Sequence, residues 1–130
     1  MISIELKENR LLSFSEMPRS SKLDSVSLAF NRLTEFSYFD HCPSLTILIL
    51  ADNKIKKLSR DIIKLAKLKT LDLTNNDLSD LPCEIGFINS LVRIQVEGNP
   101  LKTIRQSIRT GGTNVIKKYL KDKMDPNEKA

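Results

Sequence analysis

The chain has 130 residues and a formal net charge of +5, and 40% of its residues are hydrophobic while 28% are charged. This length suits one domain, and this balance argues against both a membrane protein and a disordered chain. No apolar run reaches the roughly 18 residues of a membrane-spanning helix, and the first residues lack the basic and then apolar order of a secretory signal.

One spacing of apolar residues recurs along the chain. It is clearest at residues 68–78, which have apolar side chains at places one, four, six and eleven and asparagine at place nine. Copies of this template start at residues 1, 23, 45, 68 and 91, so successive copies lie 22 or 23 residues apart. A fixed period of this length predicts stacked units that share one continuous core.

The alternation within each copy predicts one short strand. Places four and six face the core, and places three, five and seven face the other way. The asparagine at place nine follows the strand, where its amide is expected to pair backbone groups that are buried at the turn. The predicted ladder consists of Asn9, Asn31, Asn53, Asn76 and Asn99.

The pattern L-x-x-L-x-L-x-x-N-x-L at this period resembles the leucine-rich repeat family. The resemblance implies an α/β right-handed solenoid of five repeats over residues 1–110, with a parallel sheet on its concave side. Between templates, apolar residues three or four apart favour short helical or 3-10 turns on the convex side, most clearly at Leu81-Pro82-Cys83-Glu84-Ile85.

The pattern ends after Leu101. Gly111 and Gly112 interrupt the chain, and Thr113 is suited to cap the amino terminus of a helix. The residues expected on one apolar face of that helix are Val115, Ile116, Tyr119 and Leu120. We therefore expect a cap helix over residues 111–124 and a flexible tail over residues 125–130.

Roughly the second half of the chain has a narrower resemblance. Glu97-Gly98-Asn99-Pro100, Gly112-Thr113 and Tyr119-Leu120-Lys121-Asp122 are similar to the carboxyl-terminal end of the intracellular leucine-rich repeat-containing protein forty family. That family is not known as enzymatic, its repeats imply protein binding, and its chains are much longer.

The first template starts at Met1 without a preceding cap. Two interpretations compete: the chain is the carboxyl-terminal part of a longer solenoid, or a partner or second copy covers its amino-terminal end. Under either interpretation, residues 3–7 form a sheet edge through which the chain can associate with another chain.

Catalytic and metal-binding patterns are absent from the sequence. His41 is the single histidine, no Cys/His set has zinc spacing, and no glycine-rich loop has the form of a phosphate cradle. We therefore expect no enzyme, no cofactor and no metal site. The two cysteines, Cys42 and Cys83, lie at different phases of the repeat, which favours a reducing compartment: the cytoplasm, or alternatively the nucleus.

The predicted concave face carries an apolar pair in its middle repeat. Ile47 and Ile49 are expected to be exposed there, flanked by Ala29 and Ala51 and with Phe30 nearby. An apolar patch with a polar rim predicts a site for a protein partner, whereas the alternative is that the isoleucines only satisfy strand propensity. The charged residues expected to set the register of that partner are Asp72, Arg93 and Glu97.

The positive charge is concentrated in residues 54–69 and 102–121, each with a net charge of +6. These blocks suggest nucleic acid or an acidic partner as an alternative ligand, or else a solvated convex face. Nucleic acid is less favoured because exposed aromatic residues for base stacking are not interleaved with the basic ones. A third interpretation is an architectural piece of a longer scaffold.

Overall fold

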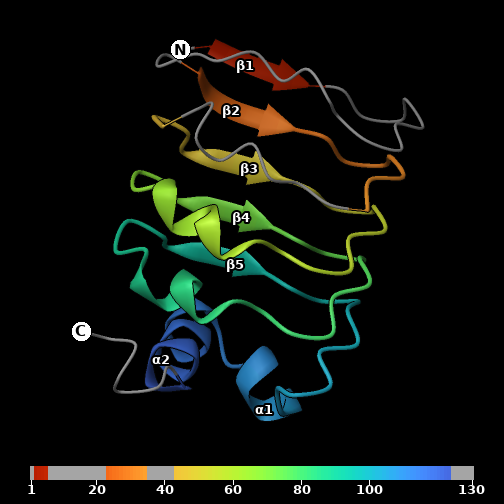
Figure 1. Ribbon diagram of the computed structural model, residues 1–130, viewed down its shortest axis with the longest axis vertical. Coiled ribbons are helices and arrows are strands. Elements are labelled where there is room, and N and C mark those ends of the chain that lie inside the picture. The colour runs from red at the N-terminus through yellow and green to blue at the C-terminus, as the bar shows by residue number, and fades with distance from the viewer. Residues whose placement is uncertain (1, 6–22, 35–42, 124–130) are drawn as a thin grey trace.

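The computed structural model describes residues 2–5, 23–34 and 43–123 of the chain. A parallel sheet runs through the described part, and its spatial order follows the chain, β1-β2-β3-β4-β5 (Figure 1). Its strands are β1 (Ile2–Glu5), β2 (Leu23–Ser27), β3 (Ile47–Ile49), β4 (Thr70–Asp72) and β5 (Arg93–Gln95).

Equivalent places of successive repeats lie side by side in the sheet. Val26 is in register with Leu48, Leu48 with Leu71, and Leu71 with Ile94. All four side chains are buried in the core. A slip of one residue would turn a whole row of side chains outward, so the burial of this row fixes the register of the stack.

Within the described residues, two 3-10 helices cover the side of the core opposite the sheet, η2 (Arg60–Lys64) and η3 (Cys83–Phe87). They pack on each other, and each buries an isoleucine, Ile62 in η2 and Ile85 in η3. The amide of Asp61 donates a hydrogen bond of 3.1 Å to the Ser59 hydroxyl, which closes the first turn of η2.

In the described part of the chain after β5, helices α1 (Gln106–Arg109) and α2 (Thr113–Lys123) lie at the β5 end of the stack (Figure 1). Ile116 and Leu120 are buried where α2 packs against η3 and β5. Val115 was expected on the same buried face, but it is 39% exposed and lies beside Gly111.

Thr113 does not cap α2 as the sequence suggested. It is the first residue of the helix, and its hydroxyl accepts a hydrogen bond of 3.1 Å from the backbone amide of Ile94 in β5. The carbonyl of Gly112 instead accepts from the amide of Ile116. Thr113 therefore satisfies a donor on the outer edge of the sheet.

A lysine also joins α2 to the last repeat. The ammonium of Lys117 donates a hydrogen bond of 2.9 Å to the carbonyl of Leu91. Burial, and secondly the charge of Lys121, lowers the pKa of Lys117. Among the described residues, no helix is both long enough and apolar enough to span a membrane.

The asparagines at place nine connect each repeat to the one before it. The amide nitrogen of Asn76 donates to the carbonyl of Leu73 in its own repeat (3.0 Å) and to that of Leu50 one repeat earlier (2.9 Å). Its Oδ1 accepts from the amide of Ile55, at 3.1 Å. Asn53 and Asn99 repeat this arrangement.

Asn31 is also buried, and its amide nitrogen donates to the carbonyls of Leu28 and Ala29. Asn9, the remaining predicted rung, lies outside the described residues. Each described asparagine thus satisfies backbone carbonyls that the turn after a strand would leave buried and unpaired.

We predict that Asn76→Ala lowers the free energy of unfolding by about 1–3 kcal/mol, because the amide of Ile55 and the carbonyl of Leu50 lose a partner in a buried place. Urea denaturation followed by circular dichroism measures the change. Asn89→Ala, at an exposed residue, is the matched control. Equal unfolding midpoints for the two variants would contradict the ladder.

The contact between η3 and α2 gives a second prediction. A Cβ on Gly86 would lie 2.7 Å from both the Lys117 carbonyl oxygen and the Lys121 amide nitrogen. Gly86→Ala must therefore push α2 away, and we expect a loss of about 1–3 kcal/mol of stability. Thermal denaturation tests it, with the exposed Ser79→Ala as control. An unchanged melting temperature would show that the two helices do not touch as described.

Candidate functional site

The candidate site lies on the face of the sheet that points away from the core, which we call the open face. Each described strand from β2 to β5 presents its first and third paired side chains here. They are Ser25 and Ser27, Ile47 and Ile49, Thr70 and Asp72, and Arg93 and Gln95. All are at least partly exposed. Register places Ile49 directly between Ser27 and Asp72.

Ile47 and Ile49 form an apolar pair in the middle of the open face. They are partly exposed rather than fully exposed, because side chains of the neighbouring strands flank them. Ala29 and Ala51, expected as accessible flanks, are only 5% and 8% exposed. The two alanines therefore offer little contact area to a partner. Phe30, by contrast, is 52% exposed.

Asp72 is held in place by Thr74, two residues after it and just beyond the end of β4. Its Oδ1 accepts hydrogen bonds from the hydroxyl of Thr74 at 2.6 Å and from the amide of Thr74 at 3.0 Å. Arg93 and Glu97 are exposed farther along the face. Within the described residues, none of the ion pairs involves Asp72, Arg93 or Glu97. The structure thus puts these charges on one face without pairing them to one another.

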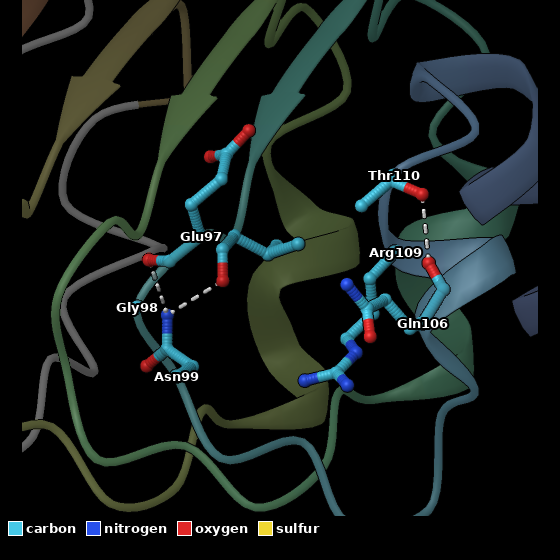
Figure 2. A pocket seen from close by; sticks show the side chains of 7 residues that line it. Glu97, Gly98, Asn99, Gln106, Arg109 and Thr110 are labelled. Atoms are coloured by element: carbon cyan, nitrogen blue, oxygen red, sulfur yellow. Dashed lines mark hydrogen bonds between the residues drawn. The ribbon is translucent and has the colours of Figure 1, made fainter.

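A hollow of about 290 Å³ lies at the end of the stack, between the segment after β5 and helix α1. Figure 2 shows Glu97 and Asn99 on one side of it and Arg109 on the other. The Nη1 of Arg109 donates to the Pro100 carbonyl at 3.4 Å, while its Nε is buried without a hydrogen-bond partner among the described residues. The repeat pattern does not point to Arg109, because this residue follows the last template.

The first basic block contributes to a second hollow, of about 270 Å³, between neighbouring turns of the stack. Lys56, Lys57 and Arg60 line it together with Ser79 and Asp80. Asp80 is already engaged, since it accepts from the Thr103 hydroxyl at 2.7 Å and lies 3.6 Å from the Lys123 ammonium. The cations therefore outnumber the acids that face them here.

The basic block is partly neutralised by one close ion pair. The Nε of Arg60 lies 2.7 Å from a carboxylate oxygen of Glu84, which is buried at the start of η3. This contact joins η2 to η3 and gives Arg60 a structural role. Within the described part of the chain, no cluster of His, Cys, Asp and Glu has the arrangement of a metal site. His41 and Cys42 lie outside that part, and Cys83 is half-exposed.

Comparison with known proteins agrees with the stacked strands and the asparagine pattern. The family described as Leucine rich repeat matches residues 21–78 and again residues 43–101. The chain belongs to the leucine-rich repeat family. Its repeats make an α/β solenoid with a parallel sheet, and proteins of this family are typically non-catalytic modules that mediate protein–protein interaction.

Two individual proteins illustrate the similarity. Plant intracellular Ras-group-related LRR protein 7 of Oryza sativa subsp. japonica is 30% identical over 66 residues, which are 50% of this chain and 25% of that protein. A solved leucine-rich repeat protein of Leptospira interrogans is 34% identical with a TM-score of 0.57, over 60% of this chain and 20% of that one. The similarity to the protein forty family remains a prediction from the sequence.

Proposed function

We propose that this leucine-rich repeat chain is a non-catalytic module that binds a protein partner on its open face. The observation that carries the proposal is the partly exposed pair Ile47 and Ile49 in the centre of that face. Asp72 lies beside Ile49 in the next strand, and Arg93 and Glu97 lie one repeat farther along the face. None of the three has an ion-pair partner among the described residues. An apolar centre with a polar rim is the usual anatomy of a protein-binding surface.

The proposal also covers the organisation of the whole chain. Residues 1–110 form five repeats that present the concave binding face, and the helix within residues 111–124 caps the core. The burial of Ile116 and Leu120 against the last repeat supports the cap. We propose the cytoplasm as the location, with the nucleus as the alternative, and β1 as an edge through which a further chain can associate.

The decisive experiment compares proteins captured from a cell lysate by the parent chain and by Ile49→Glu, identified by mass spectrometry. We expect a partner that the parent retains and the variant loses, because the new carboxylate would have to be desolvated in an apolar contact. Val92→Glu is the matched control, since Val92 is an apolar residue that is 70% exposed outside the open face. Identical lists from all three proteins would contradict binding at this face.

A second candidate function is binding of nucleic acid or an acidic partner by the basic blocks. The hollow lined by Lys56, Lys57 and Arg60 is the observation that favours it. If it holds, affinity for a single-stranded RNA oligonucleotide falls steeply with added salt. The change Lys56→Gln with Lys57→Gln then flattens the slope of log affinity against log salt by about 0.7 for each lost contact.

Fluorescence anisotropy across a salt series measures this slope. The matched control is Lys67→Gln with Lys69→Gln, which changes two exposed lysines of the same block outside the hollow. Equal slopes for the parent and both double variants would remove the nucleic-acid alternative. The third candidate, an architectural piece of a longer scaffold, is favoured if neither experiment finds a partner.

A further inference from the structure

The turn after each strand imposes an unusual backbone conformation at place eight of the repeat. Phe30, Asp52, Asn75 and Gly98 occupy this place, with φ angles of 59°, 58°, 56° and 76°. This left-handed region is open to glycine and tolerated by asparagine and aspartate, whose short polar side chains form local hydrogen bonds. Three of the four repeats therefore carry a residue suited to the turn, and Phe30 is the exception.

The three suited residues support one another. The side-chain amide of Asn75 donates a hydrogen bond of 3.0 Å to the carboxylate of Asp52 in the preceding repeat. A Cβ on Gly98 would lie only 2.0 Å from the Oδ1 of Asn75, so the following repeat needs glycine here. Place eight thus forms a short polar column along the stack.

Phe30 does not gain burial in exchange for its backbone strain. Its amide donates to the Ala51 carbonyl at 3.0 Å, which matches the Asp52 and Asn75 amides, but its ring is 52% exposed. A bulky residue is an outlier in this conformation, and strain of this kind persists where function requires it. Phe30 follows the end of β2 by three residues, so this exposed aromatic residue lies next to the open face in the chain and fits such a role.

The surroundings of Phe30 define the chemistry of its ligand. Its amide donates to the carbonyl of Ala51, two residues after Ile49, so an apolar side chain of a ligand can reach both Phe30 and Ile49. On the far side of Ile49 lies its register partner Asp72. The two bonds that Thr74 donates to Asp72 both end on Oδ1, and no bond within the described residues ends on Oδ2.

Asp52 adds a second negative charge next to Phe30, at the same place of the next repeat. The cations Arg32 and Lys54 are exposed two residues farther along their turns, after the buried asparagines Asn31 and Asn53. Among the described strand residues of the open face from β2 to β4, Asp72 is the one charged side chain, and Asp52 lies in the turn that follows β3. The charge of this part of the face complements a basic ligand.

We propose that Phe30 is the anchor of a docking surface for an extended peptide segment that carries an apolar side chain and a nearby lysine or arginine. The apolar side chain packs on Phe30 and Ile49, and the cation pairs with Asp72. The repeat of Phe30 and the repeat of Asp72 are two strand spacings apart, about 10 Å, which an extended chain covers in about three residues. This inference rests on the proposed function and specifies its partner.

The test selects ligands from a phage-displayed library of random linear peptides and then measures the affinity of one selected peptide by isothermal titration calorimetry. We expect the selected sequences to combine an apolar residue with lysine or arginine. Phe30→Asn should weaken binding by about tenfold or more. The same change should raise the melting temperature, because asparagine tolerates the left-handed turn.

This rise in stability together with a loss of binding separates an anchor from a merely structural residue, whose replacement would lower the melting temperature. Asp72→Asn keeps the Oδ1 acceptor for Thr74 and should weaken binding while reducing its dependence on salt. Val92→Asn, at an exposed apolar residue outside the open face, should change neither affinity nor its salt dependence.

The inference is overturned if Phe30→Asn leaves the peptide affinity unchanged or lowers the melting temperature. It is also overturned if the selected peptides lack basic residues or if no peptide is enriched. Ile49→Glu distinguishes this failure from failure of the proposed function. If Ile49→Glu abolishes peptide binding while Phe30→Asn does not, the open face binds but Phe30 is not its anchor. If neither variant has an effect, both the inference and the proposed open-face site are wrong.

Discussion

The structure depends on the asparagine that follows each described strand from β2 to β5. A solenoid buries backbone at every turn, and a buried carbonyl or amide without a partner is costly. One amide side chain resolves this because it offers two donors and an acceptor in the same place. Asn53 is an example: its side-chain amide donates to carbonyls in two repeats, and its Oδ1 accepts a hydrogen bond from a backbone amide of the earlier repeat. The asparagines pair the buried backbone of the turns, and the buried apolar row of the strands fixes the sheet register.

Much of the fold could be predicted from the sequence, because the spacing of residues within one repeat determines which residues of neighbouring repeats pack together. Once the period is recognised, Leu71 and Leu48 must lie side by side, and the structure has them in register. The short turns between templates followed from apolar spacing alone, and η2 and η3 lie where that spacing predicted them. The family similarity rests on the same pattern and agrees with the parallel sheet.

The details of the candidate site were harder to predict, because they depend on which atoms meet rather than on which face a residue occupies. Ala29 and Ala51 have the phase of outward residues, yet both are buried, since larger neighbours can cover a side chain as short as a methyl group. Thr113 has the sequence context of a helix cap, but β5 presents an amide that its hydroxyl satisfies instead. The strain at Phe30 is invisible in a pattern of apolar and polar residues, since it is a property of the backbone.

The strands run across the direction in which the repeats stack, and this arrangement also determines how the chain responds to force. The backbone bonds between repeats, such as that from Leu50 to Asp72, run along the stack, so a pull on the two ends of the chain loads them one row at a time. Each repeat that peels away frees 22 or 23 residues, or about 75 Å of extended chain. We therefore expect a solenoid of this kind to lengthen under force in steps of about one repeat each.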